Sequence, residues 1–118
     1  MAVKWILKQD NLIEFTISGK LTIAEYENVQ SELQAVANKV GSCRVLAILD
    51  GFTGWESAKG WENASTDHID PLIKKFAIVG DEKWRDLAEV FTLKGLRPVP
   101  IEYFSEGQEQ LAREWLDA

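Results

Sequence analysis

The sequence is short of residues on which several classes of protein depend. Cys43 is the only cysteine and His68 the only histidine among 118 residues. One thiol cannot form an internal disulfide, which favours a reducing compartment. A single imidazole excludes metal sites built on a pair of histidines. No apolar run approaches the roughly 20 residues that span a bilayer, and the N-terminal run is too short for a signal peptide. We therefore expect a cytoplasmic protein.

Positive charge is also scarce. The chain has 13 basic against 19 acidic residues and a net charge of −6. Nucleic acid is therefore an unexpected partner, because its binding proteins obtain much of their affinity from basic side chains. Attraction to anionic lipid is disfavoured for the same reason. The length fits a single domain over residues 1–118, and with 46% hydrophobic residues it can bury a core without disulfides or metal.

Alternating and continuous apolar runs predict five strands. Residues 3–8 and 12–18 alternate and are joined by Gln9-Asp10-Asn11, which predicts a β-hairpin with one face toward water. A strand is predicted over residues 44–50, whose unbroken apolar run from Val45 to Leu49 is typical of a strand covered on both faces. Residues 76–79 form a second such run. The last strand, 99–103, is interrupted by proline and should lie at an edge of the sheet, since proline cannot donate a ladder hydrogen bond.

The clearest helix signal lies between the hairpin and the central strand. Thr22 and Glu25 form a capping box, and apolar residues then recur at steps of three and four up to Gly41, a typical C-terminal stop. Two later helices are predicted over 84–91 and 105–116. Asp81 is the expected N-cap of the first, and Ser105 with Gln108 the capping box of the second. Their inward faces are predicted as Trp84, Leu87, Ala88, Phe91 and Leu111, Ala112, Trp115, Leu116.

A fourth helix is predicted over residues 56–70, but its pattern is weaker. Trp61 and His68 fall on helical spacing, whereas glycine, asparagine, serine and threonine dilute the segment and Pro71 ends it. Two alternatives follow: a movable lid over the central strand, or a short irregular helix that is fixed in place. Together these elements predict an α/β fold with a mixed, mostly parallel five-stranded sheet, an N-terminal hairpin and four helices.

The connection after the central strand is rich in aromatic residues. Phe52 and Trp55 precede the 56–70 segment, and Trp61 lies within it. Buried, they would be ordinary core residues. Exposed together, they would form an apolar patch that marks a ligand, partner or membrane contact. We favour the second alternative, because connections run over the surface. His68 is included among these contact residues because it shares the helical spacing.

Residues capable of catalysis do not form a recognisable pattern. Cys43 has no second histidine or basic cluster nearby and is interpreted as a small buried hydrophobe. No nucleophile elbow or phosphate-binding loop is present. An enzyme that uses His68 and Asp50 is the weakest of the hypotheses, and it requires both side chains to meet in one cavity. We therefore expect no enzyme activity, no catalytic residues, no metal and no cofactor.

Several segments together resemble a known group of proteins. The pattern ISGKLT-IAEYE, a strand ending in Asp50, then GFTGW, His68, FAIVGDEKW over 76–84 and YF…AREWL over 103–116 is similar to the SpoIIAA-like bacterial proteins. These belong to the STAS (sulfate transporter and anti-sigma antagonist) superfamily. The resemblance covers nearly the whole chain. It implies a small α/β sandwich with a mixed sheet, similar in shape to lipid-carrying CRAL-TRIO domains.

The resemblance also implies where function lies. Members bind apolar ligands and touch membranes through a mobile helix, which corresponds here to the segment after Asp50. Phe52, Trp55 and Trp61 are carried over as its contact residues. Anti-sigma antagonists of the superfamily are switched by phosphorylation in the same place, but their Asp-Ser-Ser/Thr-Gly-type motif is missing. Thr53 and Ser57 are the nearest hydroxyls, and Ser57 lies where a helix N-terminus would favour a phosphate.

The leading hypothesis is a non-enzymatic domain that binds a lipid or other apolar small molecule between the sheet and the 56–70 helix. Contact with a membrane surface, at the inner membrane face, would be made by inserting aromatic residues. The alternative hypothesis is a regulatory protein-interaction module of the anti-sigma antagonist kind. A homodimer is left open.

Overall fold

The computed structural model describes residues 3–9, 11–55, 70–92 and 98–118. In chain order, the elements within these ranges are β1 Val3–Gln9, β2 Leu12–Leu21, α1 Ile23–Val40, β3 Cys43–Trp55, η2 Asp70–Leu72, β4 Ile73–Gly80, η3 Glu82–Trp84, α2 Arg85–Phe91, β5 Ile101–Ser105 and α3 Glu109–Asp117, where η denotes a 3₁₀ helix. The described residues hold three α-helices instead of the four predicted. The predicted 56–70 helix lies outside them except for Asp70, which begins η2.

The five strands form one sheet in the order β1-β2-β3-β4-β5. β1 pairs antiparallel with β2, and each later pair is parallel. The predicted mixed, mostly parallel sheet with an N-terminal hairpin is therefore confirmed. So is the position of the last strand, because β5 lies at an edge.

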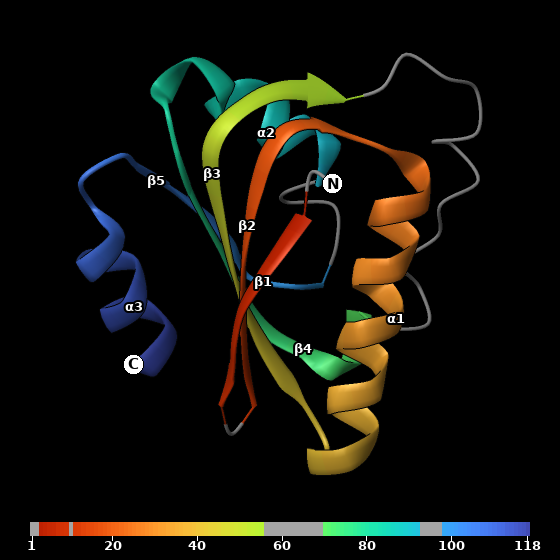
Figure 1. Ribbon diagram of the computed structural model, residues 1–118. Helices are drawn as coiled ribbons and strands as arrows, with labels where there is room; N and C mark the ends of the chain where they lie inside the picture. Colours follow the sequence, from red (N-terminus) through yellow and green to blue (C-terminus); the bar gives the residue numbers. More distant parts are fainter. Residues whose placement is uncertain (1–2, 10, 56–69, 93–97) are drawn as a thin grey trace.

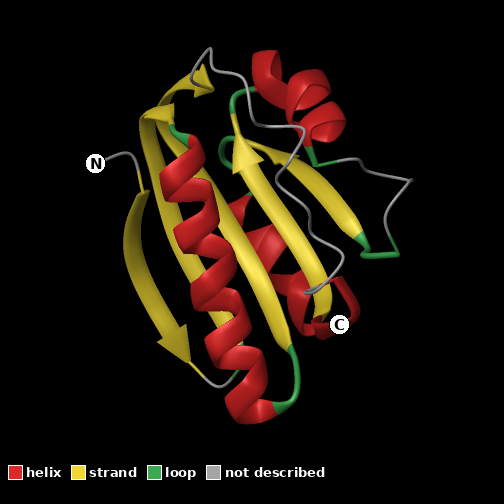
Figure 2. Ribbon diagram, turned by 90° about the vertical axis from the view of Figure 1, so that its right-hand side faces the viewer, coloured by secondary structure: helices red, strands yellow, loops and turns green. Residues whose placement is uncertain are grey.

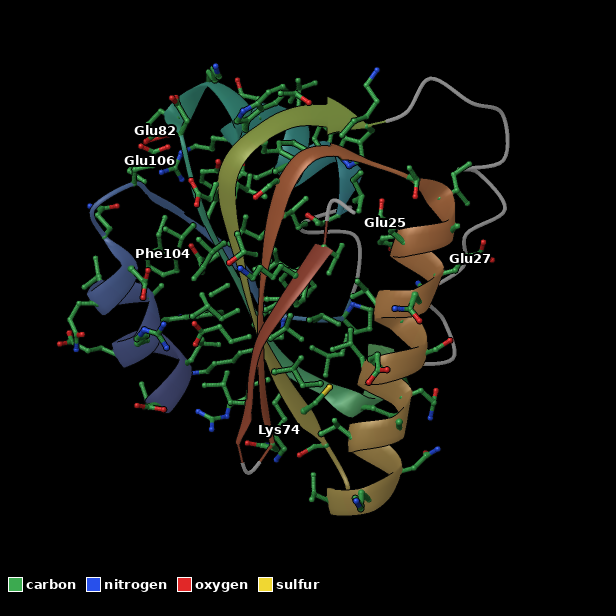
Figure 3. The ribbon with its side chains drawn as sticks, in the orientation of Figure 1. Glu25, Glu27, Lys74, Glu82, Phe104 and Glu106 are labelled. Carbon is green, nitrogen blue, oxygen red and sulfur yellow. The ribbon has the colours of Figure 1, made fainter. Side chains whose placement is uncertain are left out.

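Helices cover both faces of the sheet. α1 crosses one face, and α3 lies on the opposite one (Figure 1). Figure 2 looks onto the side covered by α1. Side chains of β3 alternate accordingly, with Val45, Ala47 and Leu49 in the core beneath α1 and Leu46 in the cluster beneath α3. Phe104 of β5 belongs to the second cluster and lies between the sheet and α3 (Figure 3).

The hairpin pattern predicted that one face of β2 points to water, but part of that face is buried, although Ser18 on it is exposed. Glu14 is only 4% exposed, because α3 covers it. Arg113 of α3 donates to both Glu14 oxygens, at 2.7 and 2.9 Å, and also to Glu109 at 2.7 Å. The hydrogen bond to Glu14 is the main reason that the pKa of Arg113 is raised. The sequence placed Glu14 correctly on the face opposite the core but could not reveal that a helix 99 residues away covers that face.

Two cations from the sheet hold the C-terminal end of α3. Arg44 of β3 donates to the main-chain oxygen of Leu116 at 3.0 Å and to the Asp117 carboxylate at 2.8 Å. Lys75 of β4 donates to the main-chain oxygen of Trp115 at 2.6 Å. Positive charge at a helix C-terminus interacts favourably with the carbonyl groups that have no partner in the helix. α3 is therefore fixed by charge along its length as well as by its small apolar face.

The central strand is longer than predicted. β3 continues past Asp50 to Trp55, although the sequence had indicated a surface connection after Asp50. Gly51 and Gly54 have φ values of 71° and 115°, and the pairing with β2 shifts register beside Gly19. Glycine adopts such conformations without steric cost, so the strand bends without ending. This bend turns Phe52 into the interior, where it is 7% exposed.

The ends of α1 follow the sequence signals. Thr22 accepts the amide of Glu25 at 3.2 Å and donates to the Glu25 carboxylate at 3.1 Å, so the predicted capping box is confirmed. The second Glu25 oxygen accepts the amide of Val3 at 3.0 Å and ties the helix to β1. Gly41 ends the helix with a φ of 92°.

The two later helices depart from their predicted ends and faces. Asp81 caps η3 by accepting the amide of Lys83 at 2.9 Å, and α2 begins only at Arg85. Only half of the predicted box at α3 forms: Gln108 accepts the amide of Ser105 at 3.0 Å, while the Ser105 hydroxyl donates to Glu82 at 2.7 Å. α3 therefore begins at Glu109.

Two leucines predicted to point inward are exposed. Leu87 of α2 is 53% exposed and Leu111 of α3 is 51% exposed. Helices of 7 and 9 residues make few turns, so each buries only a narrow stripe of side chains. Among the side chains that the structure describes, Ala88 is buried in α2, and Ala112 and Leu116 are buried in α3.

The two segments that carried the family resemblance meet at the ends of β4 and β5. A Cβ atom on Gly80 would lie 2.7 Å from the Tyr103 hydroxyl and 2.9 Å from the Leu49 side chain. The same hydroxyl donates to the main-chain oxygen of Asp81 at 2.7 Å, and burial raises the pKa of Tyr103 to about 12. Arg85 donates to the Tyr103 main-chain oxygen at 3.0 Å. These motifs therefore fix the ends of β4 and β5.

The Glu14–Arg113 pair gives a first testable prediction. Replacing Arg113→Leu should lower the free energy of unfolding by about 2–3 kcal/mol, because a buried carboxylate loses its partner. The double variant Glu14→Leu/Arg113→Leu should recover much of that loss, since it removes the charge as well. Urea unfolding followed by circular dichroism measures both. Glu109→Gln removes only the more exposed ion pair of Arg113 and is the control. It should lower the free energy of unfolding by less than about 1 kcal/mol. An Arg113→Leu cost no larger than this control would contradict the prediction.

Gly80 gives a second prediction. Gly80→Ala should destabilise the protein by about 1–3 kcal/mol, because the added methyl overlaps Tyr103 and Leu49. Removal of one overlapping atom by Tyr103→Phe should make the double variant less destabilised than the sum of the two single variants. Thermal and urea unfolding of the four proteins test this coupling. Strict additivity would show that the methyl does not meet the tyrosine hydroxyl.

Candidate ligand cavity

An apolar cavity lies between α1 and the sheet. It offers about 80 Å³ in which the centre of a water-sized molecule can move, whereas a single water needs roughly 10–15 Å³ on this measure. Strands β2, β3 and β4 and helices α1 and α2 contribute to its walls. The described residues that line it are Phe15, Ile17, Leu21, Tyr26, Val29, Gln30, Leu33, Ala47, Leu49, Phe52, Trp55, Ile73, Phe76, Ile78, Ala88 and Thr92.

The cavity walls are almost wholly apolar. No charged side chain stands among the described lining residues. Thr92 donates its hydroxyl hydrogen to the main-chain oxygen of Ala88 at 2.8 Å, which directs that hydrogen back into α2. A charged group inside such walls would lose its hydration without gaining a partner. The cavity therefore suits hydrocarbon, and any polar part of a ligand is better placed outside it.

Two rings of the cavity wall, those of Phe52 and Trp55, form an aromatic cluster with Trp84, which lies outside the described lining. The ring centroids of Phe52 and Trp55 are 5.0 Å apart, those of Phe52 and Trp84 4.9 Å, and those of Trp55 and Trp84 6.0 Å. All three pairs are edge-to-face, an arrangement favoured by the charge distribution of aromatic rings. Gly54 allows this approach, because Trp84 lies 3.7 Å from the position that a Cβ would occupy.

A second, polar pocket lies on the other side of this cluster. It opens at the carboxyl ends of β4 and β5, beside the bend of β3, and offers about 120 Å³ on the same measure. Such ends are where ligands bind in many parallel sheets. Its described lining residues are Leu49, Gly51, Phe52, Asp81, Lys83, Trp84 and Glu106. We call it the outer pocket. Leu49 and Phe52 line both spaces and so form the wall between them.

The residues predicted from the sequence are placed as follows. Phe52 and Trp55 come together in the cavity wall, so the exposed patch proposed for them is wrong: Phe52 is buried and Trp55 is half-buried. The cause is the bend in β3, which carries both rings inward. Thr53 and Asp50 are exposed on the same strand. Trp61, His68 and Ser57 lie outside the described residues.

Several lining residues were missed in the sequence. Gln30 is buried, and its position four residues after Tyr26 and three before Leu33 places it on the inward stripe of α1. That spacing could have identified Gln30 as an inward-facing residue from the sequence alone. Lys83 and Glu106 each follow the end of a parallel strand, which is the signal for a site at the carboxyl edge of a sheet.

The remaining chemistry of the described residues is sparse. Cys43 is fully buried, and burial raises the pKa of its thiol to about 11, so it stays protonated at neutral pH. This agrees with its interpretation as a small hydrophobe. Among the described residues, no group of three or more His, Cys, Asp and Glu is placed to hold a metal ion. Within the same ranges, no helix has the length and apolar character needed to cross a membrane.

Comparison with known proteins identifies the fold. A family model described as SpoIIAA-like matches residues 12–117. The crystal structure of an uncharacterized protein of the DUF3478 family from Shewanella loihica PV-4, described as having a SpoIIAA-like fold, is similar with a TM-score of 0.65. The two chains are 22% identical, and the similarity covers 98% of this chain and 92% of the other. No curated protein matches the chain. The match over nearly the whole sequence means that this chain belongs to the SpoIIAA-like family and is a STAS-type domain.

Proposed function

We propose that this protein is a non-enzymatic binding domain whose cavity takes an apolar small molecule or the hydrocarbon chain of a lipid. The observation that carries the proposal is the apolar cavity between α1 and the sheet. Ligand sites are typically concave, mostly apolar and largely preformed. The cavity fits this description.

The energetics of the core support the same proposal. Most side chains around the cavity are close-packed, including Phe15, Leu33 and Ile78, each less than 5% exposed. Where a void adjoins such residues, they lose dispersion contacts that a filled core would supply. An apolar ligand restores these contacts without having to displace a hydrogen-bonded group of the protein. Binding would therefore stabilise the fold.

The proposal includes the sequence-based prediction that the 56–70 segment covers the ligand and meets a membrane surface through Trp61. Trp61 and His68 lie outside the described residues, so their part in the contact stays a prediction. Phe52 and Trp55 take part from the inside, as cavity walls, and not as surface aromatics.

Filling the cavity tests the proposal. Ala47→Leu places a larger side chain on the cavity wall and should weaken binding of the neutral fluorescent probe N-phenyl-1-naphthylamine at least tenfold, because about three added carbons occupy its space. Fluorescence titration measures the affinity, and circular dichroism checks the fold. Ala35→Leu, on the exposed face of α1, is the matched control and should bind like the wild type. Failure of the wild-type protein to bind the probe, or equal binding by the Ala47→Leu variant, would refute the proposed cavity function.

A regulatory protein contact is the second candidate, favoured by an exposed apolar face on α2. Leu87 and Val90 are 53% and 72% exposed. Residues three apart lie on the same side of a helix, so the two form one small apolar surface. We propose this surface as the contact. Thr53 is exposed on β3, as the phosphorylation hypothesis requires, but its modification stays a prediction together with that of Ser57.

Site-specific cross-linking tests this second candidate. A photoreactive amino acid at position 87 should give a discrete cross-linked product in cells that produce the protein, because an apolar contact would cover that position. The control is position 111 on α3, which holds a leucine of similar exposure at 51%. Denaturing electrophoresis and mass spectrometry identify the products. Identical products from both positions, or none from either, would argue against a contact on α2.

A further inference from the structure

The cavity and the outer pocket are separated by very little protein. Leu49 and Phe52 line both spaces, and both come from β3, at and just before its bend. One space is apolar and lies against the core, whereas the other is polar and opens at the carboxyl edge of the sheet. Such a pair of adjoining spaces matches a molecule with an apolar chain and a polar head.

The charges around the outer pocket are unequal. Asp81 and Glu106 contribute two exposed carboxylates, and Lys83 contributes one ammonium group. Glu82 lies beside Glu106 at this edge (Figure 3), but its charge is matched by Arg85, which donates to it at 2.9 Å. Asp50, also exposed, immediately precedes Gly51 of the lining. The balance of charge therefore favours a positively charged headgroup over a negative one.

An aromatic ring in the pocket favours the same kind of headgroup. Trp84 lines the outer pocket, and the Lys83 ammonium lies 5.7 Å from the centroid of its ring. Ammonium groups are attracted to the face of an indole ring. The protein's own side chain therefore demonstrates that this ring face can hold a cation.

We propose that the protein binds single-chain amphiphiles with an ammonium headgroup, the chain lying in the cavity and the headgroup in the outer pocket. Phe52 and Leu49 act as the gate between them. This inference rests on the proposed cavity function and specifies the ligand class of that site.

Three ligands with the same number of carbons test the headgroup preference. Octylammonium, octanol and octanoate each contain eight carbons and differ in charge, and all stay monomeric at moderate concentrations. Isothermal titration calorimetry at neutral pH should give the tightest binding for octylammonium and the weakest for octanoate. The double variant Asp81→Asn/Glu106→Gln should weaken octylammonium binding about threefold to tenfold and leave octanol unchanged. Asparagine at position 81 preserves the cap on η3.

A second variant, expected to change octylammonium binding in the opposite direction, supplies the control. Lys83→Gln removes the ammonium group from the Trp84 ring and should strengthen octylammonium binding while leaving octanol unchanged. Equal binding of all three ligands, or unchanged octylammonium binding in the double variant, would overturn the headgroup assignment and leave the cavity function standing. Binding of none of the three ligands would overturn both. The two failures are thereby distinguished.

Discussion

Three parallel strand pairings lie side by side in this sheet, and parallel strands require cover on both faces. The requirement explains the placement of the helices. α1 supplies the cover on one side. Its two ends are fixed by the Thr22 cap and by Gly41. On the other side the nine-residue α3 is held by a buried ion pair, Glu14 with Arg113, and by Arg44 and Lys75 at its C-terminal end. Without α3 the apolar cluster around Leu46 and Ala77 would face water.

Local signals predicted the elements well. The capping box at Thr22, the stop at Gly41 and the prolines before the edge strand all act within a few residues, so the sequence displays them directly. Contacts between residues far apart in the sequence could not be predicted. Nothing near Glu14 indicates that a helix covers it, and a glycine pair that usually ends a strand bends β3 instead. The last two helices were misread because a short helix leaves part of its apolar pattern exposed.

For the candidate site, too, local features could be predicted from the sequence and long-range ones could not. The sequence singled out Phe52 and Trp55, and the structure brings both into the cavity wall, but they point inward instead of forming the predicted surface patch. Their direction depends on the φ angles of Gly51 and Gly54, which a sequence permits but does not specify. The outer pocket was missed because its residues come from the bend of β3 and from the segments that follow β4 and β5. It becomes visible only once Lys83, Glu106 and Gly51 are brought to one edge by the order of the strands.

The distance along the chain between Glu14 and Arg113 has a consequence for synthesis. Glu14 leaves the ribosome 99 residues before its partner. During that interval its carboxylate must remain hydrated, so the face of β2 that it occupies cannot be sealed. The sheet can close beneath α1 early, but its second face stays wet until the last helix emerges. The side of the sheet beneath α1 is thus free to form before the fold as a whole is complete.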